Sequence, residues 1–165
     1  PVEHLDRCGL LGQSLVAVHA NYLTPDDERL LAAREVSVVH CPRSHAYFGH
    51  RRFPIDTLSA AGVNLCLGTD SLASNESLSL FAEMRAFQKN FPRISPEEIL
   101  RMVTVNPAHA LRFENVLGQI RPGLGADLIA VPCSGSTNIF EQIIAFDRRV
   151  PWTMVNGSMY YARKE

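Results

Sequence analysis

The stretch Leu65-Cys66-Leu67-Gly68-Thr69-Asp70 runs from apolar residues, through a glycine, to an acid. Its apolar part has the length of a buried strand, and Asp70 stands where such a strand would give way to a polar loop. A carboxylate in that place is able to hold a metal ion or to move a proton. Aspartate is also common in turns, where it caps backbone N–H groups, and for Asp70 taken alone this structural role is favoured.

Two earlier apolar runs of strand length each lead to a histidine. Residues 14–20 contain His19, and residues 36–41 contain His40. The first run is uniformly apolar rather than alternating, which is typical of a parallel strand covered on both faces, and the second is of the same buried type. With the run that leads to Asp70, the sequence predicts three parallel strands.

Helix signals separate these strands. Thr24 is an N-cap with Pro25 at the first helical position, and Gly62 ends a helix that begins near residue 55. A polar loop is expected between His40 and that helix. Amphipathic spacing and capping residues predict further helices in residues 1–12, 78–87 and 95–102 and from residue 106 onward.

Alternation of strand and helix with short links predicts an α/β fold with a parallel sheet. Three strands with bare edges would make a poor isolated domain. Three consecutive units of a closed (β/α)8 barrel would have this pattern.

The tail of the chain has a different composition. Residues 126–131 are a predicted strand, and residues 153–161 are a predicted hairpin around the turn Asn156-Gly157. We therefore expect residues 1–117 to form part of a barrel. Residues 118–165 are expected to form a small β-rich unit packed beside it.

Composition excludes several classes of protein. The 165 residues are 46% hydrophobic and 20% charged, as in a globular domain, and the formal net charge of -1 gives no support to nucleic-acid or membrane-surface binding. No apolar run approaches the ~20 residues of a membrane-spanning helix. The four cysteines are widely spaced without a CxxC pair, which favours reduced thiols and a cytoplasmic location over a zinc knuckle or disulfide framework.

The three strand ends carry groups that suit chemistry. In a barrel the carboxyl ends of the strands open onto one face, which holds the active site, so His19, His40 and Asp70 would converge there. Histidine and aspartate are suitable metal ligands or proton shuttles. For His19 a structural role is as plausible as a functional one, whereas for His40 a structural role is favoured because Pro42 turns the chain. The GxSxG elbow of a serine hydrolase triad is absent from the sequence.

A set of motifs in a specific order resembles the C-terminal part of the amidohydrolase superfamily. The resemblance is to the branch that contains adenosine-type and guanine deaminases and triazine chlorohydrolases. The motifs are Val18-His19-Ala20, His40-Cys41-Pro42-Arg43-Ser44, Leu67-Gly68-Thr69-Asp70, Ser74-Asn75, Glu83-Met84-Arg85, Asn106-Pro107-Ala108 and Gly118-Gln119-Ile120-Arg121-Pro122-Gly123.

The resemblance implies a fold and a function. The chain would supply about strands 6–8 of a TIM (β/α)8 barrel, and residues 118–165 would be the C-terminal portion of a small β-sandwich built from both chain ends. The full-length protein would hydrolyse non-peptide C–N bonds, most simply as an aminopurine nucleoside-type deaminase acting on a small molecule. A chlorohydrolase, another amidohydrolase, a non-catalytic relative and one subunit of a split enzyme are alternatives.

The resemblance also implies one divalent metal, zinc or iron, in the full-length protein. Asp70 matches the aspartate after the eighth strand, which binds the metal and takes the proton of the attacking water. His19 matches the histidine after the sixth strand, which orients the water or stabilises the attacked centre and is a possible metal ligand. The family's other ligands, a His-x-His pair and a fifth-strand histidine, do not occur in this sequence.

The chain is therefore expected to be a fragment that binds metal weakly or not at all by itself. It would be inactive until the N-terminal half of the barrel, in the same or another chain, completes it, and a homo-oligomer is possible. The resemblance places five residues in the substrate pocket. They are Arg43, Ser44, His45, Ser74 and Asn75.

His45 departs from the family pattern, which commonly has asparagine at this position. Arg43 and His45 could recognise a polar or anionic group, and a surface loop is an equal alternative for both.

Overall fold

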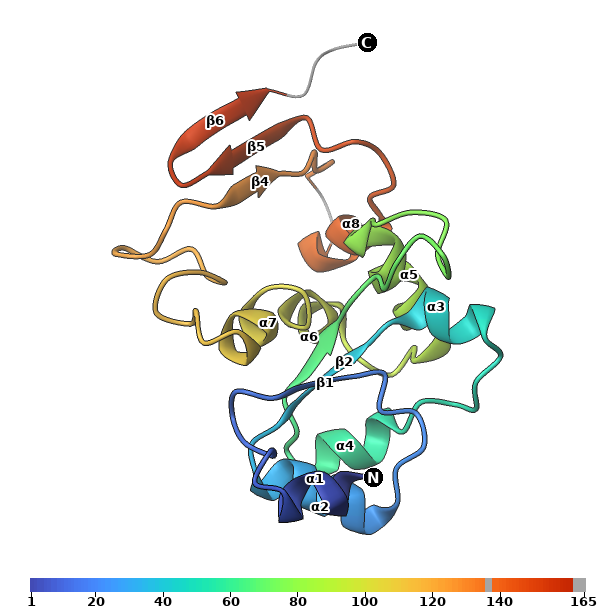
Figure 1. The fold of residues 1–165 in the computed structure, drawn as a ribbon. Helices are drawn as coiled ribbons and strands as arrows, with labels where there is room; N and C mark the ends of the chain where they lie inside the picture. Colours follow the sequence, from blue (N-terminus) through green and yellow to red (C-terminus); the bar gives the residue numbers. More distant parts are fainter. Residues whose placement is uncertain (136–137, 162–165) are drawn as a thin grey trace.

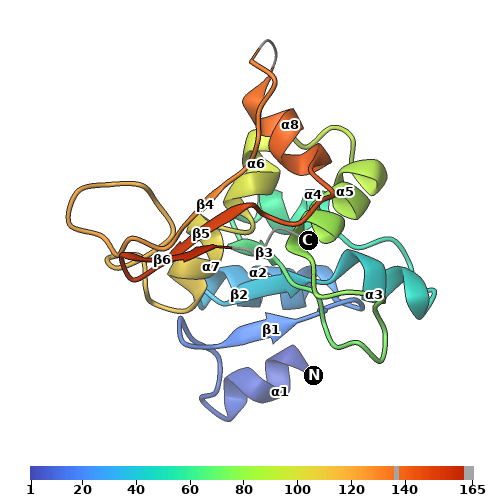
Figure 2. The same cartoon turned by 90° about the horizontal axis from the view of Figure 1, so that it is seen from above.

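The computed structural model describes residues 1–135 and 138–161 of the chain. Strands β1 (Val16–Val18), β2 (Ser37–His40) and β3 (Leu65–Leu67) form a parallel sheet in the order β1-β2-β3 (Figure 1). Helices lie between these three strands along the chain and form the crossover connections that parallel strands need. The predicted α/β alternation is therefore confirmed, and Figure 2 shows the three strands side by side.

Local signals position most of the helices as expected. Thr24 caps α2 by accepting a hydrogen bond from the Asp27 backbone, and Gly62, with φ of 78°, follows the end of α4. Ser95 and Glu98 form a capping box at the start of α6. The bounds are α1 (Val2–Arg7), α2 (Pro25–Ala33), α4 (Ile55–Ala60), α5 (Leu80–Asn90), α6 (Pro96–Arg101) and α7 (Val105–Ala110).

Two helices correct the sequence predictions. The expected polar loop after His40 contains α3 (Pro42–Tyr47). Pro42 lies in its first turn, where backbone N–H groups have no partner within the helix, so the N–H that proline lacks is not needed. The tail expected to be β-rich contains α8 (Ile139–Ala145), capped by Asn138. This helix forms because Ile144, which is fully buried, packs into the same core as the parallel sheet.

The core lies between the parallel sheet and the helices around it. The apolar residues with no exposed surface come from β2, α4, α5, α6 and α8, and they are Val38, Leu58, Phe87, Ile99 and Ile144. Both views show α8 beside α5 and α6 (Figures 1 and 2). The tail is thus joined to the first part of the chain by apolar packing.

Strand β1 departs from the prediction that both of its faces are covered. Val18 is 53% exposed, whereas the strand β3 is buried along its length. Within the described residues β1 and β3 are the two edge strands of the sheet, but β3 also contacts α5 and α7, which cover it. The uniformly apolar strand β1 is therefore only partly buried.

The second sheet is antiparallel. It contains β4 (Leu128–Ala130), β5 (Trp152–Val155) and β6 (Ser158–Tyr161) in that order. Asn156 and Gly157 both have positive φ, as the two-residue hairpin turn between β5 and β6 requires. The predicted strand and hairpin are confirmed, and Figure 1 shows this sheet at the opposite end from α1 and α2. Among the described residues, no helix has the length and apolar character needed to span a bilayer.

Candidate active site

The ends of the three parallel strands place His19, His40 and Asp70 at one edge of the sheet. His19 directly follows β1, His40 is the last residue of β2, and Asp70 lies three residues beyond β3. The residues that directly follow β1 and β3 are still hydrogen-bonded to β2. The His19 amide donates to the Val39 carbonyl at 2.8 Å, and the Gly68 amide donates to the His40 carbonyl at 2.9 Å. The predicted convergence is thus present.

Two of these residues adopt a backbone conformation that is uncommon outside glycine. The φ angle is 71° at His19 and 57° at Asp70. Left-handed residues of this kind are often found where the surrounding structure holds a functional side chain in place. Both proposed catalytic residues therefore sit in backbone that is turned sharply at the strand end.

Asp70 is surrounded by hydrogen-bond donors. Its Oδ2 accepts from Ser44 Oγ at 2.6 Å and from Ser74 Oγ at 2.9 Å, and its Oδ1 accepts from the Ser71 amide at 2.8 Å. These bonds, with the nearby His19, lower the pKa of the Asp70 carboxyl. The Nε2 of His19 lies 3.8 Å from Oδ2. Asp70 is accordingly an ionised acceptor at neutral pH, with 28% of its side chain exposed.

Gly68 makes the close strand exit possible. A Cβ atom on Gly68 would lie 2.8 Å from Cγ1 of Val39 and 3.3 Å from Sγ of Cys41.

Burial raises the pKa of Cys41 to about 11 and that of Cys66 to about 12. Both cysteines are therefore neutral packing residues beside the site, as expected for reduced structural thiols.

His40 is a core histidine, as predicted. Its ring stacks on Phe53 with centroids 4.1 Å apart, and burial lowers its pKa to about 3 with smaller contributions from His45 and His19. The imidazole is neutral at physiological pH. Its buried Nδ1 has no hydrogen-bond partner within the described residues.

The predicted pocket residues lie in three different surroundings. Ser44 binds Asp70 directly. His45 faces Asn21 and the Arg51 carbonyl, at 3.0 Å and 2.7 Å from its two ring nitrogens, and burial lowers its pKa. Three predicted residues line one cavity of about 500 Å³, and they are Arg43, Ser74 and Asn75.

Arg43 and Asn75 are both held by neighbours. The guanidinium of Arg43 donates to Ser77 Oγ and to Glu76, each at 3.0 Å. The Asn75 amide nitrogen donates to the Thr69 carbonyl at 2.7 Å. Arg43 is thus the cationic group of the cavity, which its partner Glu76 also lines, whereas the amide nitrogen of Asn75 is engaged inside the protein.

The comparison with known families decides the class of this site. Residues 1–159 match the amidohydrolase family. The chain belongs to this family. An adenosine deaminase from Xanthomonas campestris with bound zinc superposes with a TM-score of 0.90 at 34% identity over 96% of this chain. An atrazine chlorohydrolase from Arthrobacter aurescens, complexed with zinc, has a TM-score of 0.85 at 24% identity and shows the shared fold.

The similar curated sequences are longer amidohydrolases. A 5-methylthioadenosine/S-adenosylhomocysteine deaminase of Pyrococcus furiosus is 41% identical over 138 residues, which are 79% of this chain and 32% of that protein. A 5'-deoxyadenosine deaminase of Methanoregula boonei is 38% identical, with 92% and 41% coverage. The chain therefore spans 32% and 41% of the length of these two relatives, and the resemblance found in the sequence motifs is confirmed.

The donors at the strand ends suit part of an amidohydrolase metal site. A carboxylate and an imidazole are ligands that zinc takes in catalytic sites, and Asp70 and His19 supply one of each. In residues 1–135 and 138–161, no group of three or more His, Cys, Asp or Glu side chains is arranged to hold a metal ion. The residues present fit the metal as an incomplete set.

One buried acid near the amidohydrolase site was not predicted to act there. Glu83 in α5 is fully buried, and its two oxygens accept hydrogen bonds from the Arg43 amide and from Asn75. The sequence does contain a signal for it. Glu83 stands beside Met84 on the apolar side of an amphipathic helix, where an acid needs a specific partner.

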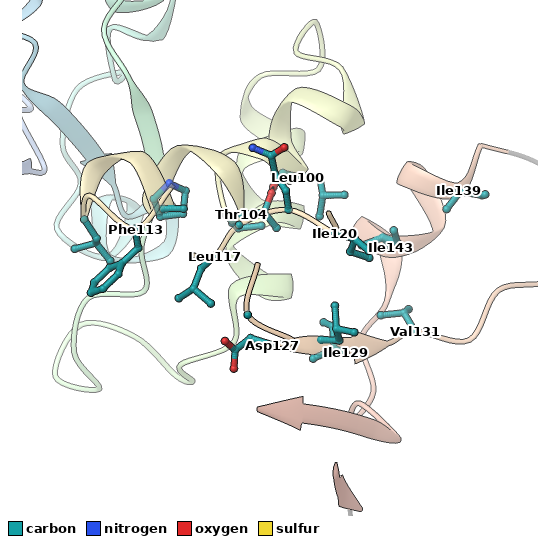
Figure 3. Close-up of a pocket in the computed structure, with 18 of the residues that line it drawn as sticks. Leu100, Thr104, Phe113, Leu117, Ile120, Asp127, Ile129, Val131, Ile139 and Ile143 are labelled. Atoms are coloured by element: carbon teal, nitrogen blue, oxygen red, sulfur yellow. The ribbon is translucent and has the colours of Figure 1, made fainter. Parts of the chain in front are cut away.

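A larger cavity lies away from Asp70. It has a volume of about 610 Å³ and is lined by side chains of α6, α7, β4 and α8 and of the connection between α7 and β4. Figure 3 shows its apolar lining, which includes Leu117, Ile120, Ile129 and Ile143. Among the described residues that line it there is no histidine, and its acid, Asp127, accepts a hydrogen bond from the Asn156 amide at 2.9 Å.

Proposed function

We propose that this chain is the C-terminal part of a metal-dependent deaminase that acts on aminopurine nucleosides. The observation that carries the proposal is the Asp70 carboxylate at a strand end, held by three donors and facing His19 at 3.8 Å. Similar proteins named as deaminases of adenosine-type nucleosides support the substrate class. Because the chain spans less than half of those relatives, the activity is assigned to the full-length protein.

The chain is proposed to supply about strands 6–8 of a TIM barrel. Residues 1–117 would belong to the barrel, and residues 118–165 to the C-terminal portion of a β-sandwich. Three neighbouring parallel strands in sequential order support the first assignment, and the separate antiparallel sheet supports the second. The zinc-containing adenosine deaminase is covered to 39% by this chain, which is consistent with a part of a barrel.

A divalent metal, zinc or iron, would be held by Asp70, with His19 as a possible second ligand from this chain. The remaining ligands would come from the N-terminal half of the barrel, in the same or another chain. A bound divalent cation lowers the pKa of water to about 7 and so supplies hydroxide at neutral pH.

Asp70 and His19 would then manage the proton and the attacked carbon. Asp70 accepts the proton of the attacking water and passes it to the leaving amine, so that ammonia departs and a carbonyl replaces the C–N bond. His19 orients the water or stabilises the charge that develops on the attacked ring. Ser44 and Ser74 fix the Asp70 oxygen on the side that faces His19.

The cavity beside Arg43 is the proposed location of part of the substrate. Arg43 carries a charge there and is held by Glu76 and Ser77, so a polar or anionic substituent would find a donor already oriented. His45 is not among the residues that line this cavity and lies against Asn21 and the Arg51 carbonyl, so its proposed role in recognition would be indirect.

Ammonia release by the full-length protein tests this function. Adenosine, 5'-deoxyadenosine, 5-methylthioadenosine and S-adenosylhomocysteine would be supplied to zinc-loaded protein, with a chlorotriazine in parallel. We expect ammonia from at least one nucleoside and no chloride from the triazine. Chloride release without ammonia would instead assign a chlorohydrolase.

A further inference from the structure

Glu83 is a buried acid that ties separate loops together. Its Oε2 accepts from the Arg43 amide at 3.0 Å, and its Oε1 accepts from Asn75 Nδ2 at 2.6 Å. The same Asn75 nitrogen donates to the carbonyl of Thr69, the residue that directly precedes Asp70. Both oxygens of the buried carboxylate therefore have partners, as a buried charge requires.

The residues that Glu83 binds are chain neighbours of the donors around Asp70. Arg43 is followed by Ser44, and Asn75 is preceded by Ser74. The hydroxyls of Ser44 and Ser74 both donate to the same oxygen, Oδ2, of Asp70. Holding Arg43 and Asn75 at a fixed separation thus fixes the two serine donors relative to each other.

Packing alone does not account for an acid at this position. Glu83 has no exposed surface, and its neighbour Met84 and the nearby Phe87 belong to the apolar core. Desolvation raises the pKa of Glu83, which shows that burial disfavours its charged form. An apolar side chain of similar volume would avoid this penalty, as replacements of buried ion pairs have shown in other proteins.

We propose that Glu83 is a positioning residue, which sets the orientation of the Asp70 carboxylate by fixing the two loops that carry its serine donors. The inference rests on the proposed function only in taking Asp70 as the catalytic acid. Glu83 acts through the Arg43 amide and the Asn75 side chain. Both of its oxygens must accept, and an amide in its place has only one acceptor.

The first test is the variant Glu83→Gln in the full-length zinc-loaded protein. Glutamine keeps the shape but turns one acceptor into a donor, so either the Arg43 bond or the Asn75 bond is lost. We expect kcat to fall about tenfold or more, as it does in other enzymes when a residue that orients a metal ligand is mutated. KM should change by less than about threefold. Glu97→Gln is the matched control, because Glu97 is exposed on α6.

The second test needs no activity. Backbone amide exchange in the metal-free full-length protein should become faster in residues 41–45 and 69–75 of Glu83→Gln and stay unchanged elsewhere. Asn75→Ala removes the hydrogen bond between Asn75 and Glu83 and retains the bond between the Arg43 amide and Glu83. It should therefore speed amide exchange in residues 69–75 only. In the double variant, the loss of kcat should be smaller than the product of the two single losses, because both act through one oxygen of Asp70.

These readouts separate the inference from the proposed function. If the wild-type protein releases no ammonia from any nucleoside, the proposed function fails. The exchange pattern still tests whether Glu83 holds the two loops through the Arg43 amide and Asn75. If the wild type is active and Glu83→Gln matches Glu97→Gln in kcat and in exchange, the inference is wrong. Faster exchange throughout the chain, with unchanged kcat per folded molecule, would also contradict it, because Glu83 would then be a stability element only.

Discussion

The Nε2 atom of His19 lies 3.8 Å from Oδ2 of Asp70, although the two residues leave different strands of the sheet. The oxygen that faces His19 is the one that accepts from Ser44 and Ser74. The three groups therefore converge on a single carboxylate oxygen. Their convergence gives this edge of the sheet a charged acceptor with a defined direction, which proton transfer needs.

Removal of one serine donor should weaken catalysis without unfolding the protein. In Ser44→Ala, Oδ2 of Asp70 loses its shortest hydrogen bond, 2.6 Å in length, and the carboxylate is free to turn. We expect kcat of the full-length protein to fall by about tenfold to a hundredfold. Ser59→Ala, on the exposed side of α4, should leave kcat unchanged. Equal rates for the two variants would show that this hydroxyl does not orient Asp70.

A side chain at Gly68 should destabilise the strand exit. Its Cβ would lie 2.8 Å from Val39 Cγ1, so Gly68→Ala forces β2 and β3 apart, at an expected loss of about 1–3 kcal/mol. Gly12→Ala is the control, because a Cβ there meets no atom within 4 Å. Urea-induced unfolding of the full-length variants would measure the difference. A Gly68→Ala protein as stable as the control would contradict the close packing of the two strands.

Acid should destabilise the fold through His40. Its pKa is about 3 in the folded chain and near 6.5 when unfolded, so the unfolded state binds the proton more readily. Stability present above about pH 6.5 should be lost toward pH 3, by about 1.4 kcal/mol per pH unit.

His40→Gln cannot titrate and therefore isolates this effect. Between pH 7 and pH 5 the wild type should lose about 2 kcal/mol more than the variant in urea-induced unfolding, whatever the variant's stability at pH 7. Parallel pH profiles for the two proteins would show that His40 takes up a proton without unfolding.

The exposed edge at β1 should make the isolated chain associate. Val18 is 53% exposed, and unpaired strand edges recruit other strands. We expect the 165-residue chain alone to release no ammonia from nucleosides and to elute as oligomers in size-exclusion chromatography with light scattering.

Val18→Lys should reduce this association, because a charge at the edge opposes pairing. Val155→Lys, 48% exposed in the C-terminal hairpin, controls for the loss of apolar surface. A wild-type chain that stays monomeric and deaminates a nucleoside would contradict the assignment of a partial barrel.

The sequence predicted those features that are set by neighbouring residues. The caps at Thr24 and Ser95, the turn at Asn156-Gly157 and the positive φ at Gly62 depend on interactions within a few residues. The convergence of the strand ends also followed, because parallel strands open at one edge and Asp70 lies at the end of one of them.

The remaining features depend on contacts between distant parts of the chain. Glu83 binds the Arg43 amide, which is 40 residues away along the chain. Local sequence patterns therefore cannot predict this hydrogen bond. The sequence predicts a loop where α3 lies because Pro42 suggests a turn, although proline is accepted in a first helical turn. The exposure of Val18 depends on which distant segments cover an edge strand, because the other edge strand, β3, is buried, and the composition of β1 does not reveal this.

Nucleoside deamination by the full-length protein, measured as ammonia release before and after complete chelation and in Asp70→Ala, tests the central claim most directly. We expect chelation to abolish the activity of the wild type and zinc to restore it. Asp70→Ala should lower kcat at least about a thousandfold, because the variant lacks both a metal ligand and the proton acceptor. Wild-type turnover that persists without metal, or an Asp70→Ala variant with wild-type kcat, would contradict the assignment.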